Sequence, residues 1–345
     1  MADSLSVAVV GATGAVGQEF LTLLVERRFP FRSLKLLASA RSAGKRLAVG
    51  DQELVVEELR PDSFAGVDLA FFSAGAGVSR EFAPRAVAAG AVVIDNSSAF
   101  RMDDTVPLVV PEINPQDLRR HRGIIANPNC STIILSLPLY ALHRAAGVKR
   151  VVVSTYQAVS GAGARAMQEL EEQLQQVQRG GEIVARILPV ASLPHHYPIV
   201  HNVIPQVDVF AEDGFTKEEW KMIRETRKIF HAPELQVVAT TVRVPVLRSH
   251  SESVAVELER PLSVEEAREV FASMPGVVVQ DRPEDQVYPM PYFTSGTDPV
   301  YVGRIRRDPT VPAGLLFWVV GDQIRKGAAL NGLQIAEWMR QEGMI

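Results

Sequence analysis

The sequence predicts an α/β protein with two domains: a parallel sheet covered by helices on both faces, followed by an α+β domain. Three observations support this fold class. Short segments rich in Val, Ile, Leu and Phe alternate with helix-compatible segments over residues 1–128. The first of these segments runs into a glycine-containing loop, and the apolar segments after Cys130 become longer and more alternating. With 345 residues, 47% of them hydrophobic, the chain is long enough to bury two cores.

The elements of the first domain follow one another in βα order. Residues 5–10 (LSVAVV) are expected to form a buried strand, and apolar residues recur at helical spacing over 16–24. Further strands are expected at 34–39, 54–59, 68–75 and 91–98, with a helix over 79–90. Such alternation indicates parallel strands joined by helical crossovers.

The second domain is predicted to have an antiparallel or mixed sheet with helices on one face. Longer strands are expected within 148–161, 240–247 and 251–259, a polar helix over 167–182, and a strand followed by a helix within 314–340. Residues 281–314 are expected to be irregular, which suggests an interaction arm or subunit contact. The predicted divisions are 1–128, 129–321, and 322–345 as a C-terminal helix that packs on the first domain.

Composition excludes several classes of function. The net charge is −4 and no dense run of Lys or Arg occurs, so we expect no binding to nucleic acid. The single cysteine rules out an intramolecular disulfide and a CxxC metal site, and we expect no metal. The first residues lack the basic region of a signal peptide, and no apolar stretch is long enough to span a bilayer. A cytoplasmic location is therefore expected, with no membrane partner.

The loop G-A-T-G-A-V-G places Gly11, Gly14 and Gly17 between the first strand and its helix. Glycines at such a junction let backbone N–H groups approach a pyrophosphate at the N-terminus of the helix, as in Rossmann-like domains. A bare glycine triplet is a weak signal, and the alternative is a tight turn without a ligand. The buried strand before it and the amphipathic helix after it favour a dinucleotide site.

The end of the next strand favours NADP over NAD. NAD-binding proteins usually offer Asp or Glu there to the ribose hydroxyls. Here the sequence is Ser39-Ala40-Arg41-Ser42, with Lys45 and Arg46 close behind. A cation with two hydroxyls suits a 2′-phosphate, although a solvated basic loop would have the same composition.

Cys130 lies in the stretch A-N-P-N-C-S-T, just before an apolar run. Pro128 and Asn129 end the preceding structure, and Ser131 or Thr132 could cap the helix that follows, which Pro138 is expected to kink or shorten. The N-terminus of a helix favours thiolate and can stabilise an oxyanion, so Cys130 is a candidate nucleophile. The alternative is that it packs as a small buried hydrophobe.

A nucleophile also needs a base, and among the seven histidines His250 stands out. It follows a probable strand and lies near Arg243, Arg248 and Glu252 in the sequence. Sequence alone does not place it beside Cys130.

The motifs GATGAVGQ, SSAFRMD, NPNCST, YQAVSGAG, RVPVLRSHSE and GDQIRKGAA occur in this order. In content and spacing the chain resembles, over essentially its whole length, the aspartate-β-semialdehyde dehydrogenases, and the arm SGTDPVYVGRIRRD resembles the form found in many Gram-positive and thermophilic bacteria. The resemblance implies interconversion of L-aspartate-4-semialdehyde, phosphate and NADP⁺ with 4-phospho-L-aspartate and NADPH. This reaction belongs to the biosynthesis of lysine (through diaminopimelate), threonine and methionine.

The resemblance also implies a role for individual residues. Cys130 matches the nucleophile that carries the acyl-thioester, and His250 matches the acid/base that takes the thiohemiacetal proton as the aldehyde is released. Substrate and phosphate contacts are expected at Arg101, Asn129, Gln157, Glu218, Lys221 and Arg243. Cofactor contacts are expected at Gly11, Thr13, Gly14, Ala15, Val16, Gly17, Arg41, Ser42, Ser73, Ser160, Gly161 and Gln323. The Asn129 side chain or a backbone N–H at the start of the helix is the candidate oxyanion donor.

Taken singly, these polar residues have ordinary explanations. Arg101 and Arg243 could form surface ion pairs, Lys221 could be a solvated helix charge, and Gln157 could bond a turn. Two arginines and a lysine together suit a substrate that carries a carboxylate and a phosphate. Rival interpretations are an N-acetyl-γ-glutamyl-phosphate reductase and a non-catalytic relative of the same fold. A homodimer or homotetramer is expected from the resemblance.

Overall fold

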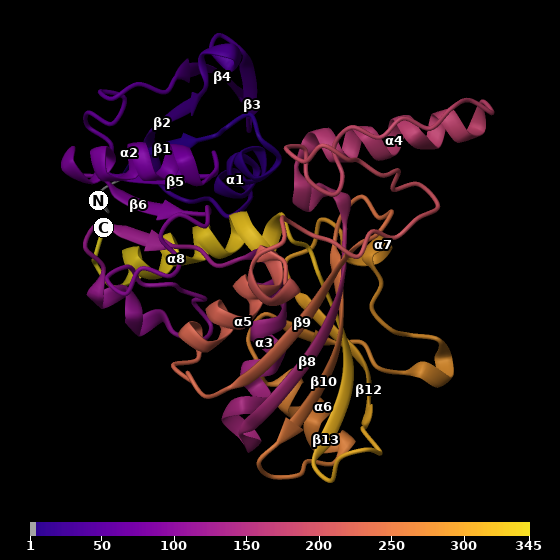
Figure 1. The fold of residues 1–345 in the computed structure, drawn as a ribbon. Coiled ribbons are helices and arrows are strands. Elements are labelled where there is room, and N and C mark those ends of the chain that lie inside the picture. Colours follow the sequence, from indigo (N-terminus) through magenta and orange to yellow (C-terminus); the bar gives the residue numbers. More distant parts are fainter. Residues whose placement is uncertain (1–4) are drawn as a thin grey trace. The chain divides into compact units, whose positions relative to one another are not determined.

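The computed structural model describes residues 5–345, which divide into two compact units (Figure 1). Unit 1 comprises the chain up to Asn129 together with Ala328–Ile345, and unit 2 comprises Cys130–Gly327. Residues 322–327, expected to belong with the C-terminal helix, are part of unit 2. The reason is that the Asp322 carboxylate and the Gln323 amide form hydrogen bonds within that unit.

Unit 1 is built on a parallel sheet that ends in an antiparallel hairpin. Among the described residues the strand order is β3-β4-β2-β1-β5-β6-β7, and only β3 and β4 pair antiparallel. Its elements are β1 (Leu5–Val10), α1 (Ala15–Glu26), β2 (Phe31–Ala38), β3 (Arg46–Val49), β4 (Gln52–Glu58), β5 (Leu69–Phe72), α2 (Ala76–Ala88), β6 (Val92–Asp95), β7 (Ile124–Ala126) and α8 (Leu330–Gln341). The five strands and two helices expected from the sequence are present. The short strands β3 and β7 were not expected.

Alternate residues of β1 face two separate cores. Val7 and Val9 pack in a cluster with Phe20 of α1 and Leu333 of α8, whereas Ala8 and Val10 belong to a cluster that includes residues of α2. Both faces of the sheet are therefore covered, which is why β1 is buried at every position and apolar at all but Ser6. The C-terminal helix completes one of these cores.

Unit 2 contains a mixed sheet with strand order β11-β12-β13-β10-β8-β9 in the described chain. Its elements are α3 (Cys130–Ala146), β8 (Val148–Gln157), α4 (Ala164–Gln178), α5 (Lys217–Ile229), β9 (Gln236–Arg243), β10 (His250–Leu258), α6 (Val264–Ala272), β11 (Val277–Val279), α7 (Pro291–Thr294), β12 (Val300–Arg307) and β13 (Gly314–Gly321). Strand β10 pairs antiparallel with β8 and β13, and β8 pairs parallel with β9. The predicted mixed sheet is confirmed.

The two faces of this sheet differ in burial. Helices α3, α5 and α6 pack on one face, where the side chains of β8, β9 and β10 are buried at every second position. The alternate positions, such as Ser253 and Tyr156, are half-buried or exposed. This alternation explains the pattern seen in the sequence.

Two expectations about this unit were wrong at least in part. Of the two effects expected of Pro138, a kink or a shorter helix, shortening does not occur, because α3 continues for 17 residues. Most of its side chains are buried, and we attribute the tolerance of the missing N–H to this packing. The segment 281–314 is not irregular throughout, because its residues Val300–Arg307 form β12 and pair with β13.

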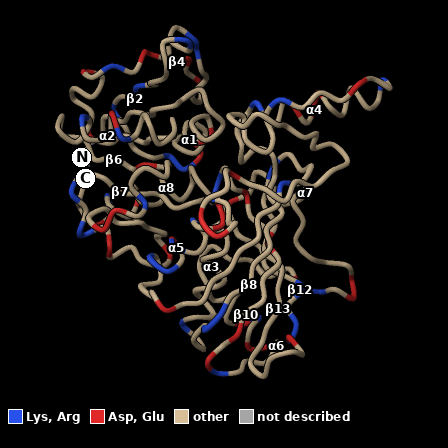
Figure 2. Tube along the Cα trace, in the orientation of Figure 1, with Lys and Arg blue, Asp and Glu red and all other residues tan. Residues whose placement is uncertain are grey.

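Helix α4 shows how a polar helix is held in unit 2. Ala166 and Leu170 pack against Leu188 and Ile199 of the following segment, while charged and amide side chains occupy the rest of the helix. Figure 2 shows both acidic and basic residues on α4 and on α5. An apolar stripe therefore attaches α4, and the buried Glu169 and Gln173 side chains add hydrogen bonds from the backbone N–H groups of the same segment.

Candidate active site

Cys130 and His250, 120 residues apart in the sequence, lie side by side in unit 2. The distance from Cys130 Sγ to His250 Nε2 is 3.5 Å. Cys130 is the first residue of α3, and His250 is the first residue of β10. Because α3 packs on the face of the sheet to which His250 belongs, both residues reach the same point. The helix N-terminus favours the thiolate form of Cys130.

The imidazole of His250 is held in one tautomer. The Ala158 backbone N–H donates to Nδ1 over 3.0 Å, so Nδ1 carries no proton. Burial, followed by the positive charge of Arg243, lowers the pKa of His250 to about 3, while Glu218 opposes this shift. A neutral imidazole then carries its proton on Nε2 and donates it toward the sulfur. The resting side chain is thus a hydrogen-bond donor to Cys130.

Arg243 is buried beside this pair and has an unused donor. In the sheet register it lies opposite Gln157, and its Nη1 donates to the Ala158 carbonyl over 2.6 Å. Its Nε has no hydrogen-bond partner among the described residues. Burial lowers the pKa of Arg243, while the negative charges of Glu218 and Cys130 raise it. A buried guanidinium N–H without a partner suits an anionic ligand.

A second group of polar side chains surrounds Glu218, in the first turn of α5. Gln157 Nε2 donates to Glu218 Oε1 over 3.3 Å and to Ser131 Oγ over 2.8 Å. Lys221 Nζ donates to Glu218 Oε2 over 3.1 Å and to Asp208 Oδ2 over 2.8 Å. The structure therefore joins Gln157, Glu218 and Lys221 in one network, and their roles toward substrate and phosphate stay predictions.

Two glycines leave space around the reactive atoms. A Cβ added at Gly161 would lie 2.9 Å from Arg243 Nη1 and 3.2 Å from His250 Nε2. A Cβ at Gly327 would lie 3.1 Å from the Cβ of Cys130. A side chain at either position would crowd the site, so glycine is needed there for space.

Ser160 and Gln323 are also joined within unit 2. The Gln323 amide nitrogen donates to Ser160 Oγ, and its oxygen accepts the Ser249 N–H, one residue before His250. Both side chains are buried. These two expected cofactor residues therefore lie on the segments that border His250.

Arg101 and Asn129 belong to unit 1. Arg101 is buried, and its Nε and Nη2 donate to the carbonyl oxygens of Asn127 and Asn96 over 2.9 and 2.8 Å. Its guanidinium thus supports the turn that precedes Cys130 in the chain. Its role toward phosphate and the role of Asn129 toward an oxyanion stay predictions.

The glycine loop of unit 1 fits a dinucleotide. Gly11 has φ +84°, and a Cβ on it would lie 2.8 Å from the Ser73 carbonyl oxygen; a Cβ on Gly17 would lie 2.2 Å from the Gly11 oxygen. The loop can be this tight only with glycine. It follows β1, which has β2 on one side and β5 on the other, the switch point where α/β sheets bind ligands.

The remaining cofactor residues line this loop or follow β2. Gly14 stands at the N-cap of α1 without a side-chain cap, and Ala15 and Val16 begin the helix, so backbone N–H groups face outward there. Thr13 Oγ1 donates to Ser42 Oγ at 3.5 Å, which connects the loop to the segment after β2. Arg41 is exposed in that segment. The site has the cation and hydroxyls expected for a 2′-phosphate.

Three residues of the site were not predicted: Ser131, Asp208 and Glu252. Ser131 and Asp208 are partners of Gln157 and Lys221, and a pattern of residue types carries no signal for such long-range contacts. Glu252 lies two residues after His250 on the same face of β10, opposite Thr155. Neither of its oxygens has a hydrogen-bond partner among the described residues, nor does the Thr155 hydroxyl. Burial and the charge of Glu218 raise the pKa of Glu252 well above its usual value.

The polar character of this face is limited to two rows of the sheet. The first row contains Arg243, Gln157 and His250, and the second contains Thr241, Thr155 and Glu252. Beyond them the paired residues on the same face are apolar, for example Val153 with Val254. The site thus occupies one end of an otherwise apolar core.

Within residues 5–345, no group of three or more His, Cys, Asp or Glu side chains could hold a metal ion. No helix in that range has the length and apolar character needed to cross a bilayer.

Comparison with known proteins gives matches over nearly the whole chain. Residues 6–121 match the family model "Semialdehyde dehydrogenase, NAD binding domain", and residues 139–326 match "Semialdehyde dehydrogenase, dimerisation domain". The aspartate-semialdehyde dehydrogenase of Bacillus subtilis (strain 168) is 51% identical over 100% of both chains. That of Aquifex aeolicus (strain VF5) is 53% identical over 98% of this chain and 99% of its own. The crystal structure of aspartate semialdehyde dehydrogenase II from Vibrio cholerae, complexed with ASA, has a TM-score of 0.92 at 41% identity and covers 99% of each chain.

Replacing Glu252 with Gln should change how stability depends on pH. Above the usual pKa of 4.5 the unfolded chain releases the Glu252 proton while the folded protein keeps it, so wild-type stability falls as pH rises. The Glu252→Gln variant lacks this proton. The free energy of unfolding of the variant, relative to wild type, should therefore increase as pH rises. The increase should be up to about 1.4 kcal/mol per pH unit until Glu252 ionises in the folded wild-type protein.

Urea denaturation at about pH 5 and about pH 8 measures this difference. Glu257→Gln is the control. Glu257 is a half-exposed residue of the same strand, so this variant shows the effect of removing a carboxylate from β10 without removing the buried one. An advantage of Glu252→Gln that is the same at both pH values would contradict the prediction.

His250 should stay neutral, with its proton on Nε2, between about pH 5 and about pH 8. The reason is the Ala158 N–H on Nδ1 together with the burial that lowers the pKa of the imidazole. Nitrogen-15 NMR of the imidazole groups measures both properties, and the signal lost in His250→Ala assigns the residue. Protonation of His250 near its ordinary pKa, or a proton on Nδ1, would refute this assignment.

Proposed function

Because the chain belongs to the aspartate-semialdehyde dehydrogenase family, we propose that Cys130 and His250 are the residues through which it performs that reaction. The enzyme interconverts L-aspartate-4-semialdehyde, phosphate and NADP⁺ with 4-phospho-L-aspartate and NADPH, a step in the biosynthesis of lysine, threonine and methionine. The observation that carries the proposal is the 3.5 Å contact between the Cys130 sulfur and the His250 Nε2 beside a buried arginine with an unused N–H.

In the biosynthetic direction the Cys130 thiolate attacks the acyl carbon of aspartyl phosphate. The C–O bond to phosphate breaks, phosphate leaves, and Cys130 holds the β-aspartyl group as a thioester. NADPH, when bound, supplies the hydride that reduces this thioester. Collapse of the resulting thiohemiacetal releases the aldehyde and returns the thiolate.

His250 acts in this sequence through its Nε2 proton. In the resting state Nε2–H donates to the sulfur, which stabilises the thiolate and orients its lone pairs. When negative charge develops on the substrate oxygen, the same donor can stabilise it at low cost because the imidazole is already fixed. Taking up the thiohemiacetal proton, as the sequence predicted, requires Nε2 to be free of its own proton at that moment.

Substrate orientation follows from the charges around Cys130. The unused Nε of Arg243 suits the α-carboxylate, and the carboxylate of Glu218 suits the α-ammonium group. Gln157 connects Glu218 to Ser131, the residue after the nucleophile. A free amino acid carries both charges, whereas the N-acetylated substrate of the rival reductase lacks the ammonium. This site therefore favours the aspartyl substrate.

Phosphate binding is assigned to Arg101 and Lys221. Lys221 is half-buried and paired with two carboxylates, so an arriving phosphate would compete with Asp208 for it. Arg101 already donates to two carbonyl oxygens, which fixes the direction of its guanidinium. We assign the oxyanion donor to Asn129 or to a backbone N–H at the start of α3.

We assign the cofactor as NADP rather than NAD. The glycine loop of unit 1 excludes any residue with a side chain at Gly17, and Arg41 with Ser42 stands where an acidic residue would select the unphosphorylated ribose. In unit 2, Ser160, Gly161 and Gln323 border His250 and are assigned to the nicotinamide side. A cytoplasmic location agrees with the single thiol that must stay reduced.

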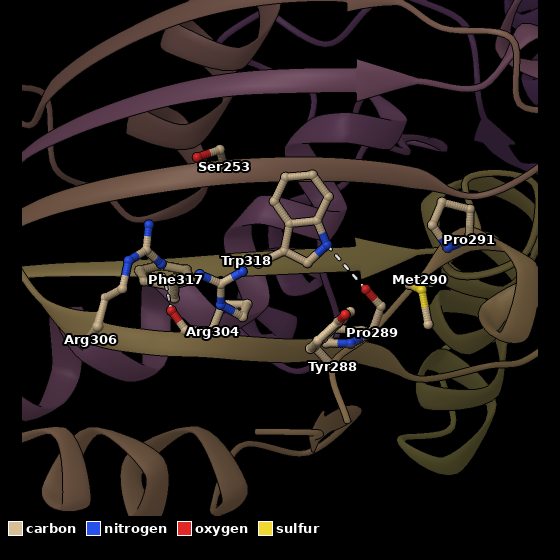
Figure 3. A pocket seen from close by; sticks show the side chains of 9 residues that line it. All are labelled: Ser253, Tyr288, Pro289, Met290, Pro291, Arg304, Arg306, Phe317 and Trp318. Carbon is tan, nitrogen blue, oxygen red and sulfur yellow. Dashed lines mark hydrogen bonds between the residues drawn. The ribbon is translucent and has the colours of Figure 1, made fainter. Parts of the chain in front are cut away.

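The chain carries a dimerisation domain, and we propose that it forms a homodimer through the half-exposed face of the unit 2 sheet. A pocket of about 270 Å³ on this face is lined by Ser253, Tyr288, Pro289, Met290, Pro291, Arg304, Arg306, Phe317 and Trp318 (Figure 3). The Trp318 indole donates to the Pro289 carbonyl over 3.1 Å, and its ring lies 5.3 Å from that of Tyr156, which is 39% exposed. Aromatic groups surrounded by arginines are typical of protein interfaces.

Cys130→Ser should lower turnover by roughly 10⁴-fold or more, because the hydroxyl is a far weaker nucleophile than the thiolate. The measurement is phosphate-dependent reduction of NADP⁺ with aspartate semialdehyde, with the N-acetylated glutamate analogue as the competing substrate. His250→Ala should cost on the order of 10²-fold to 10⁴-fold. Folding and NADP binding should match wild type in both variants.

A fully active serine variant would refute the nucleophile. A preference for the N-acetylated substrate would instead show that the reductase interpretation is correct. Lack of NADP-dependent aldehyde oxidation by the wild-type protein would support the non-catalytic interpretation.

Trp318→Arg should convert the homodimer to monomers, because it places a charge in the centre of the proposed interface. Light scattering coupled to size-exclusion chromatography measures the mass. Val55→Arg, an exposed position on β4 of unit 1, is the matched control and should stay dimeric. A dimer that persists in Trp318→Arg would exclude this face.

A further inference from the structure

One short loop of unit 2, residues 322–324 with the π-helical turn that follows it, reaches both reactive residues. It begins at the end of β13, its residues 325–327 belong to the π-helix Arg325–Ala329, and the N–H of Gly327 donates to the Asp322 carbonyl over 3.0 Å. At its far end, Gly327 packs against the backbone and Cβ of Cys130, so closely that an added Cβ would lie 3.1 Å from it. At its near end, the Asp322 carboxylate contacts the turn that carries His250.

The Asp322 carboxylate is fully buried and joins three segments. Its Oδ2 accepts Arg248 Nε over 2.5 Å and the Gly296 N–H over 2.7 Å. Its Oδ1 accepts the N–H groups of Ile324 and Arg325 over 2.9 and 3.2 Å. Four donors satisfy the buried charge, and one of them comes from two residues before His250.

The residue between Arg248 and His250 has a conformation that needs external support. Ser249 has φ +73°, a region that side chains other than glycine rarely adopt, and it is fully buried. Its N–H donates to Gln323 Oε1 over 2.8 Å, and its hydroxyl lies 3.1 Å from the hydroxyl of Ser295. A strained residue persists where its neighbours hold it from several sides. Here the neighbours are the residue after Asp322 and the residue before Gly296.

We propose that Asp322 is a positioning residue for the Cys130–His250 pair. Its carboxylate ties the turn that carries His250 to the loop that packs on Cys130, and thereby sets the distance between the sulfur and the imidazole. This inference rests on the roles proposed above for Cys130 and His250.

The physical consequence concerns the thiolate. The Nε2–H of His250 stabilises negative charge on Cys130 only if it stays within hydrogen-bond distance of the sulfur. Loss of the Arg248–Asp322 ion pair frees the turn before His250, so the donor moves and thiolate becomes less favoured. Substrate binding through Arg243 and Glu218 does not pass through this loop. The effect should therefore fall on turnover and thiol reactivity rather than on substrate affinity.

The test is the Asp322→Asn variant, which keeps an acceptor for the Ile324 and Arg325 N–H groups but removes the negative charge. Cys130 is the single cysteine of the chain, so the rate of alkylation by iodoacetamide reports on it alone. At about pH 6 we expect alkylation roughly tenfold slower than in wild type. We expect kcat to fall by about 10- to 100-fold with KM for aspartate semialdehyde near the wild-type value.

Asp281→Asn is the matched control. Asp281 is another buried carboxylate of unit 2, and it accepts Arg268 Nε over 2.8 Å and the Ile305 N–H over 3.2 Å. Its loss removes a comparable ion pair at a site without contacts to Cys130 or His250 in the described structure. Thermal stability should fall in both variants, but kcat and alkylation should change only in Asp322→Asn.

Arg248→Gln provides a second variant if Asp322→Asn does not fold. It removes the same ion pair from its more exposed partner, and it should reproduce the slower alkylation and lower kcat. Arg248→Lys restores a cation and should recover part of both.

The proposal is overturned if Asp322→Asn, or Arg248→Gln in its place, matches wild type in alkylation and kcat. It is also overturned if Asp281→Asn shows the same losses, because general loosening would then explain them. An inactive wild-type protein, or an active Cys130→Ser variant, would instead refute the proposed function. Failure of this inference and failure of the proposed function can be told apart, because the first is seen in the Asp322, Arg248 and Asp281 variants and the second in the wild-type protein and Cys130→Ser.

Discussion

The backbone N–H and carbonyl groups of Ala158 orient two buried side chains of the site, those of His250 and Arg243. Its N–H donates to His250 Nδ1 and its carbonyl oxygen accepts Arg243 Nη1, over 3.0 and 2.6 Å. Ala158 directly follows β8, which lies between β10 and β9 in the sheet. His250 is on β10 and Arg243 is on β9. The register of three strands therefore sets the imidazole tautomer and the direction of the guanidinium together. A slip of one residue in either pairing would turn these side chains to the other face.

Burial explains both the chemistry and its energetic cost. Removing His250 from water keeps its imidazole neutral, and removing Arg243 strengthens its attraction for an anion. The buried polar atoms of Glu252 and Thr155 have no hydrogen-bond partners in the described structure, which further destabilises the folded state. The apolar rows beyond them, together with the helices that cover them, offset this cost. Perturbed groups at one end of a well-packed sheet are typical of active sites.

Both units use glycine, the residue without a side chain, but for different structural reasons. In unit 1, the turn at Gly11 and the close approach of Gly17 in α1 to it bring backbone N–H groups to the end of a parallel sheet. In unit 2, Gly161 and Gly327 leave space beside His250 and Cys130. Gly11 and Gly17 are needed for backbone conformation or close approach of two backbone segments. Gly161 and Gly327 are needed because a side chain would fill the space beside the reactive atoms. The absence of a side chain is used in both.

The sequence by itself determined the fold class, five of the strands of unit 1 and its helices, the position of Cys130 at a helix start, and the family. Local patterns carry these properties: apolar periodicity, glycine spacing and ordered motifs act over a few residues. Pattern was misleading at Pro138 and over 300–307, where packing and strand pairing outweigh local preference. Only the tertiary structure decided that His250 lies beside Cys130 and that its proton is on Nε2. The same holds for the burial of Glu252 two residues after His250 and for the ion pair of Asp322 with Arg248, two residues before it. These properties depend on strand register and on contacts between residues that are tens to more than a hundred positions apart, and such contacts leave no local mark in the sequence.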